Sequence, residues 1–590
     1  MTRHIHISTA AALMLLGLTG CNGILDVSPK DQLSDVDAVF ADPGLAEGFL
    51  NDIYGGLGHG LYEIMLGSLT DETHFIHGYG TDKIVQSLIT ASDRGAIDDG
   101  RFSHFNWGSN YYRIRQANIF LSHIDATTFD ADWKQRMKGE AYFLRAYFYH
   151  NLMRMYGGVP LITKVYDLNE DYKVARNSFK ETVDFIVANA DSAAQLLPLS
   201  YSGDNLGRAT KGAALALKAR VLLYAASDLY NVNPSGKAEN GYTTPQDRTA
   251  LWRAAKNAAK AVMDLGIYRL FRPSPASAQE ATQNYGDLFL QKTSEEVILS
   301  RFFLTSRDDG YNPGLHNGPN GYHNWAGNTP IQSLIDDYRM ADGSKFDWTN
   351  PAQAAAPYAN RDPRFYASIL YDGARWRERP ADVKDRDPYG MVQTFRALTL
   401  PDNSVVAGLD TRDSPIEDWN GSYSGYYIRK FIDPSVAHST TVKENVPWIF
   451  FRYAEILLNY AEASIELGEV GDALTVLNQI RRRAGMPDLA AGPGLRDEYR
   501  NERRIEMAFE EQRFFDVRRW MIAPQALSTN AGGINIFLEG ASRTDRTTWK
   551  NYRYETRKIQ DRAWNNKMYF MPIHRDELNR NSLLTQNPGY

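Results

Sequence analysis

The sequence predicts a mostly α-helical protein in which about four helix pairs form a scaffold for a loop-rich, irregular portion with short strands. Apolar residues recur at steps of three or four over long segments on both sides of the chain's middle. One pair of such segments, residues 452–485, is about 34 residues long, the period of tetratricopeptide repeats. Between the periodic segments of the N-terminal and C-terminal parts, residues 271–448 lack this periodicity, and Gly, Pro, Asn and Asp interrupt their short apolar runs.

The chain begins with features of secretion and lipid attachment. Residues 1–20 have a basic start at Arg3 and a short apolar stretch, Ala10 to Leu18, which is too short to span a bilayer and is typical of a signal peptide. Leu18-Thr19-Gly20-Cys21 resembles the bacterial lipobox, which implies cleavage before Cys21 and lipidation of its thiol. The alternative is an ordinary signal with an incidental cysteine. Residues 21–40 are expected to be a tether.

The first half of the fold, residues 41–270, is predicted to be helical. Ala141, Leu144, Phe148 and Leu152 follow helical spacing within 132–156, and a Gly-Gly-Val-Pro turn ends this helix. A capping box at Ser178-Phe179-Lys180-Glu181 predicts the start of the next helix. Residues 212–229 and 251–265 resemble a further pair with a polar loop between them.

The second half, residues 271–590, contains the loop-rich insertion 271–448 and the C-terminal helix pairs 449–525. In the pair at 452–485, Gly468 lies near the expected break between the two helices. The basic run Arg481 to Arg483 and the mixed charges near Arg503 and Arg504 predict a helix surface with many ion pairs. Helix-pair stacking needs several units to enclose a core, hence the expectation of about four.

Composition excludes several function classes. With 590 residues and 43% hydrophobic content, the chain can form one large domain or two closely packed ones. The net charge of −6 provides no basic surface for nucleic acid. Cys21 is the single cysteine, so no internal disulfide and no cysteine-ligated zinc site can form.

An ordered series of short motifs along the whole mature chain is similar to the SusD/RagB family. The motifs are Cys21 to Lys30, Asp71-Glu72, Trp107 with Tyr111 and Ala117-Asn118, Glu140 to Ala146, Tyr156 to Pro160, Lys211 to Ala214, Thr329-Pro330, Arg361 to Arg364, Pro447-Trp448, Arg452 to Glu455, Glu502 to Arg504, Arg513 to Asp516 and Gln586 to Tyr590. The resemblance implies a lipid-anchored, surface-exposed protein of the cell outer membrane, with outer-membrane lipid contacted through acylated Cys21.

The same resemblance implies a function and a partner. Members of this family capture nutrients, most often glycans, and deliver them to a SusC-like TonB-dependent transporter on which they lie as a lid. An oligosaccharide is therefore the expected ligand. A peptide or another nutrient is an alternative for the same architecture, and a surface glycosidase is a further one.

Candidate ligand-binding residues come in two clusters. In starch-binding relatives, aromatic contacts follow an Asp-Glu turn, and the resemblance assigns these positions to Phe75 and His77, where those relatives have tryptophans; this difference leaves the sugar specificity open. The second cluster lies in a Gly/Asn-rich loop before Thr329-Pro330, where aromatic rings suit the flat C–H faces of sugars. Its members are Tyr311, His316, Tyr322, His323 and Trp325. Trp376 is a weaker exposed candidate, and Trp107 is assigned to the core because Tyr111, Ile114 and Asn118 follow it at helical steps.

No enzymatic function is expected. A glycosidase needs two separated carboxylates, whereas Asp98-Asp99, Asp308-Asp309 and Asp336-Asp337 are adjacent pairs. The sequence has no phosphate-binding loop, dinucleotide fingerprint or nucleophile elbow. His74 and His77 have a spacing that metals sometimes use, but no further ligands accompany them, so no metal site and no cofactor are expected. A structural calcium held by loop oxygens is left open.

Overall fold

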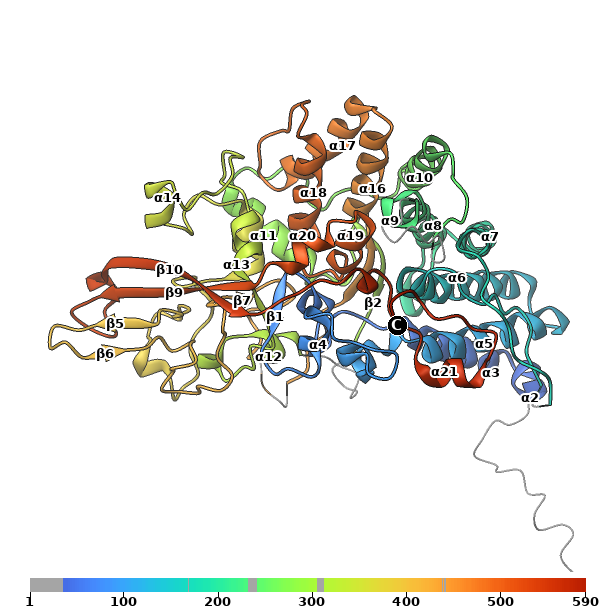
Figure 1. Ribbon diagram of the computed structural model, residues 1–590, viewed down its shortest axis with the longest axis horizontal. Coiled ribbons are helices and arrows are strands. Elements are labelled where there is room, and N and C mark those ends of the chain that lie inside the picture. Colours follow the sequence, from blue (N-terminus) through green and yellow to red (C-terminus); the bar gives the residue numbers. More distant parts are fainter. Residues whose placement is uncertain (1–35, 168, 232–240, 305–311, 438, 440–441) are drawn as a thin grey trace, which may run out of the picture.

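The helical scaffold and the loop-rich portion lie side by side in the computed structural model, which describes residues 36–167, 169–231, 241–304, 312–437, 439 and 442–590 (Figure 1). The signal peptide, Cys21 and Tyr311 lie outside these described residues. Helix α2, Val36–Ala41, begins within the stretch expected to be a tether. In Figure 1 the long helices lie in the right half of the molecule, and a long β-hairpin extends to the left beside a few short helices.

Four successive helix pairs form the scaffold, which confirms the predicted fold class. Their helices are α3 (Pro43–Tyr54) with α5 (Trp107–His123), α6 (Ala131–Tyr156) with α7 (Phe179–Leu196), α8 (Lys211–Ala226) with α10 (Arg248–Met263), and α16 (Tyr453–Glu466) with α17 (Val470–Arg483). Each pair also contacts the next, because α5 packs on α6, α7 on α8 and α10 on α16. Trp107 is buried in this core, as predicted.

Local chemistry explains where these helices begin and end. The Ser178 hydroxyl accepts a hydrogen bond from the Glu181 backbone N–H, and the Glu181 carboxylate accepts one from the Ser178 N–H, so the predicted capping box is confirmed. Gly157 after α6 and Gly468 between α16 and α17 have φ of 83° and 74°. Glycine adopts this left-handed region without a Cβ penalty, which allows the chain to reverse there.

The loop-rich portion is held by short helices and strands. Helices α11 (Ala278–Leu288), α12 (Pro313–Asn317), α13 (Gln332–Asp337), α14 (Pro351–Ala355) and α15 (Pro363–Ser368) lie within it. Outside it are the short helices α4 (Thr81–Val85) and α9 (Asp228–Asn231) and the C-terminal helices α18 (Leu495–Glu506), α19 (Arg513–Arg519), α20 (Ala523–Ser528) and α21 (Arg575–Arg580). Strand pairs are β1 (Thr73–Phe75) with β3 (Asn328–Pro330), β2 (Val297–Arg301) with β8 (Trp448–Arg452), and β4 (Ile369–Leu370) with β7 (Tyr427–Ile428). A four-stranded sheet has the order β10 (Lys550–Gln560), β9 (Ala531–Glu539), β5 (Ala397–Thr399) and β6 (Val405–Val406). The β9–β10 hairpin was not among the predicted elements.

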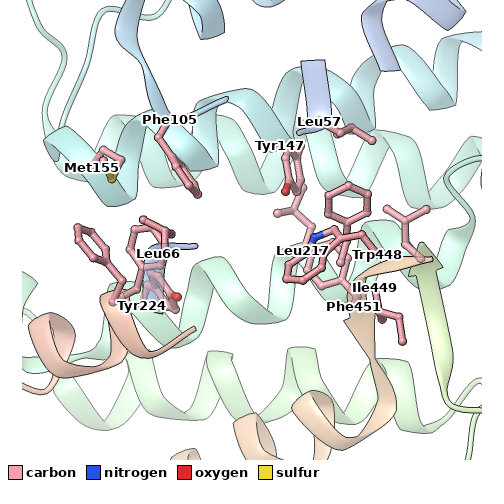
Figure 2. Close-up of a cluster of buried hydrophobic side chains, with 14 of the residues drawn as sticks. Leu57, Leu66, Phe105, Tyr147, Met155, Leu217, Tyr224, Trp448, Ile449 and Phe451 are labelled. Carbon is pink, nitrogen blue, oxygen red and sulfur yellow. The ribbon is translucent and has the colours of Figure 1, made fainter. Parts of the chain in front are cut away.

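Strand β8 joins the loop-rich portion to the scaffold. Figure 2 shows Trp448, Ile449 and Phe451 of this strand beside Tyr147 of α6 and Leu217 of α8, within one buried hydrophobic cluster. All five side chains are less than a tenth exposed. Burial of large apolar groups from both portions stabilises their contact, since each fully buried side chain contributes about 1.5–3 kcal/mol.

The arginine- and glutamate-rich motifs near the C-terminus are buried, so the prediction of an ion-paired helix surface is wrong for most of them. Arg483, Arg503 and Glu506 are 0% exposed. Arg483 pairs with Glu296 at 3.1 Å and also with Glu506, which in turn lies 2.6 Å from Arg452. Arg482, in contrast, lies at the surface with a side chain that is 65% exposed. Helical spacing reveals which residues share a face, but not whether another element covers that face.

The adjacent buried carboxyls Asp71 and Glu72 have pKa values that are shifted in opposite directions. Asp71 pairs with Arg513 at 2.7 Å and with Arg504 at 3.1 Å. Burial opposes ionisation of Asp71, but the two guanidinium groups outweigh it and hold the pKa of Asp71 well below its usual range. Burial and the negative charge of Asp71 together raise the pKa of Glu72 from 4.5 to about 7. One Glu72 oxygen accepts the Phe509 N–H at 3.2 Å, while the other, buried, has no hydrogen-bond partner among the described residues.

Glu72→Gln is therefore expected to change the pH dependence of stability. A carboxyl whose folded-state pKa exceeds its unfolded value favours folding when protonated, and this benefit is lost as pH rises from about 4.5 through 7. The neutral amide removes the loss, so the variant should gain about 2–3 kcal/mol in unfolding free energy relative to wild type between pH 4.5 and pH 8. Urea unfolding at pH 4.5 and pH 8 measures the difference in unfolding free energy between the variant and the wild type. A difference that is the same at both pH values would contradict the raised pKa of Glu72.

Candidate ligand-binding site

The pairing of β1 with β3 brings the two predicted clusters together. These strands are antiparallel with Phe75 opposite Asn328, so the residues that follow β1 lie beside those that precede β3. His77 Nε2 is consequently 3.0 Å from the backbone oxygen of Trp325, although the two residues are 248 positions apart in the sequence. Both side chains are half-buried at the surface.

The structure divides the predicted residues into accessible and buried ones. His323 is exposed, with His77, His316 and Trp325 partly accessible. Phe75 and Tyr322 are only 2% and 1% exposed, so neither ring offers the open stacking face that was expected. Phe75 is inside β1, and Tyr322 lies beneath the guanidinium of Arg379, 4.1 Å from the ring centroid. Trp376, expected to be exposed, is also buried, at 8%.

Two exposed aromatic residues beside this region were missed in the sequence. Trp419 is 61% exposed, and its ring centroid lies 6.2 Å from that of His77. Tyr79 is 52% exposed and lies 5.6 Å from Phe75, which also contacts His77. We call Tyr79, His77 and Trp419 the aromatic rim. The sequence signal for Trp419 is its place among polar residues before an Asn-Gly turn, but nothing local indicates which distant segment it joins.

The aromatic rim is positioned by charged neighbours. Arg101 lies over the Tyr79 ring at 5.1 Å and pairs with both Asp99 and Glu63. Arg412 donates a hydrogen bond of 3.0 Å to the backbone oxygen of Trp419. Such contacts reduce the freedom of the loops and so lower the ordering cost when a ligand binds.

A cavity of about 810 Å³ has Trp325 in its wall. We call it the Trp325 cavity; its wall includes Trp325, Tyr322, His323, Arg377, Arg379, Glu378, Pro380, Pro434 and Ser435. His316 stacks behind Trp325 with 5.5 Å between ring centroids and an angle of 27°. His323 Nε2 contacts the Asp382 carboxylate at 3.0 Å. The cavity therefore combines aromatic faces with charged hydrogen-bonding groups, as small-molecule sites do.

The side chains at the aromatic rim and in the Trp325 cavity are of the types that bind sugars. Aromatic faces can cover the C–H surface of a sugar, while histidine, arginine and carboxylate groups can hydrogen-bond its hydroxyls. Across the described part of the chain, no group of three or more His, Cys, Asp or Glu residues is arranged to hold a metal ion.

Models of known protein families match both the N-terminal and the C-terminal parts of the chain. Residues 295–590, half of the chain, match the model of the SusD family. The chain belongs to the SusD family. Residues 25–223 of this SusD-family protein also match a model described as starch-binding associating with outer membrane. Among its described residues, no helix is both long and apolar enough to cross a membrane.

Relatives of this SusD-family protein support the same conclusion. A SusD-like protein from Bacteroides fragilis is 30% identical, with a TM-score of 0.74 over 95% of this chain and 100% of that one. SusD-like protein P38 of Formosa agariphila is 22% identical over 88% of this chain and 91% of its own length. A structure described as a laminarin-binding SusD-like protein has 20% identity, covers 93% of this chain and 99% of its own, and shares the fold with a TM-score of 0.60.

Proposed function

We propose that this SusD-family protein is a non-catalytic lipoprotein, anchored through acylated Cys21 on the surface of the outer membrane. It captures a glycan on the aromatic rim and in the Trp325 cavity, and it passes the glycan to a SusC-like TonB-dependent transporter. The observation that carries the proposal is the exposed Trp419 ring beside His77, next to a cavity with a second tryptophan in its wall. Exposure of a large aromatic side chain to water is unfavourable, and exposed apolar groups that cluster together are typical of binding sites.

Several further features support the proposal. The loops that carry the rim and the cavity are connected to paired strands and helices, which is where binding residues are usually displayed. The family model that matches residues 25–223 is described as associating with the outer membrane. A relative of the same fold is described as binding laminarin, a polysaccharide. The lipobox-like sequence before Cys21 supports anchoring.

Retention without cleavage tests this function. The purified mature chain is immobilised and exposed to a panel of polysaccharides, and the bound and released sugars are analysed by chromatography. At least one polysaccharide should be retained, with no shorter products after several hours. Products that accumulate at enzymatic rates would contradict non-catalytic capture, and retention of peptides in place of every polysaccharide would contradict glycan binding.

A further inference from the structure

Arg377 is a half-buried cation in the wall of the Trp325 cavity. Its Nη1 donates to the backbone oxygen of Val436, and its guanidinium lies 5.5 Å from the centroid of the Tyr322 ring. The Tyr322 hydroxyl donates a 3.1 Å hydrogen bond to the backbone oxygen of Arg377. These contacts hold the side chain at the cavity without neutralising its charge.

The contrast with Arg379, two residues later, is informative. Arg379 is buried and pairs with Asp387 at 2.8 Å and with Asp410 at 2.7 Å. Arg377 forms no ion pair with any described carboxylate, and its buried Nε has no hydrogen-bond partner among the described residues. A partly buried cation without a counter-ion is unfavourable, since burial removes its hydration.

The surroundings of Arg377 confirm that its charge is only weakly balanced. Burial lowers the pKa of Arg377, and the carboxylate that acts against this, Glu444, accepts a hydrogen bond from the backbone of Gly314. Glu378, the carboxylate in the cavity wall, pairs with Lys384. Arg377 is therefore the cation of the cavity wall that has no paired carboxylate among the described residues.

We propose that Arg377 is a specificity-determining residue which binds the acidic group of a charged glycan, a carboxylate or a sulfate, in the Trp325 cavity. The inference rests on the proposed glycan-binding function and names the class of glycan. A guanidinium presents parallel N–H donors that match two oxygens of either group, and charge-assisted hydrogen bonds of this kind are about twice as strong as neutral ones. Trp325 belongs to the wall of the same cavity and supplies an aromatic side chain for the sugar that carries the acid.

Matched pairs of polysaccharides test the inference. The probes are polygalacturonate with its carboxyl-reduced form, carrageenan with its desulfated form, and neutral laminarin, each titrated calorimetrically into the mature chain. At least one native acidic polysaccharide should bind about tenfold or more tightly than its neutralised form. The pair that shows this preference identifies the acidic group as a carboxylate or a sulfate. Its binding should also weaken as salt is raised.

Variants of two neighbouring arginines assign the effect to one side chain. Arg377→Gln should lower the affinity for the acidic form about tenfold, with little change for the neutralised form. Arg375→Gln is the control, because Arg375 is exposed and is not part of the cavity wall. Arg377→Lys keeps the positive charge but lacks the planar guanidinium, so its affinity for the acidic form should lie between those of the wild type and Arg377→Gln. With two variants of the same position, a folding defect in one of them does not decide the outcome.

Each outcome has a defined meaning. Equal binding of the acidic and neutralised forms, or an Arg377→Gln protein that keeps the preference, would overturn the role of Arg377. Binding of laminarin alone would overturn the preference for acidic glycans and leave glycan capture intact. Failure of every polysaccharide to bind would count against the proposed function itself, and with it this inference.

Discussion

Arg452→Ala is expected to lower the unfolding free energy by about 3–5 kcal/mol. Arg452 is 1% exposed and holds three carboxylates, with Glu296 at 2.8 Å, Glu506 at 2.6 Å and Glu510 at 2.7 Å. Removing the guanidinium leaves these carboxylates buried with one cation fewer among them. Breaking one side of a buried ion pair costs more than the pair contributes, because the partner keeps its desolvation penalty.

Urea unfolding at pH 7, followed by circular dichroism, measures this loss. Arg482→Ala is the matched control, because Arg482 pairs with Asp488 at the surface with a side chain that is 65% exposed. A surface pair of this kind contributes about 0–1 kcal/mol. Similar losses in the two variants would contradict a larger contribution from the buried network than from a surface ion pair.

Trp419→Ala is expected to weaken glycan binding about ten- to hundredfold while leaving thermal stability nearly unchanged. The ring is 61% exposed, so its removal creates no buried cavity in the protein. A sugar stacked on this ring would lose a large apolar contact, and tryptophans at binding sites often contribute 2 kcal/mol or more. Calorimetric titration with the polysaccharide that the wild type retains gives the affinity.

Tyr112→Ala provides the control for this substitution. Tyr112 is 57% exposed on helix α5 of the scaffold and belongs to neither the aromatic rim nor the Trp325 cavity. Its loss should leave glycan affinity unchanged. Equal affinity of the Trp419→Ala and wild-type proteins would remove the aromatic rim from the site.

Trp325→Ala is expected to weaken binding as well, since Trp325 lines the cavity.

Periodicity along the chain was enough to predict the helical scaffold. The helices α6, α7, α16 and α17 follow the apolar spacing, the capping box at Ser178 and the glycine at 468, all of which act within a few residues. The hairpin β9–β10 was missed; its inner strand β9 is stabilised by pairing with β5, more than 130 residues earlier. Strand pairing of that kind leaves little local signal.

The candidate site divides in the same way. The sequence by itself determined which segments are rich in aromatic residues, including the positions of His77 and Trp325. Only the tertiary structure decided that these two meet, that Phe75 and Tyr322 are covered, and that Trp419 and Arg377 join them. Whether a ring stacks on a ligand or fills a core depends on what packs over it, and those neighbours lie far away in the chain.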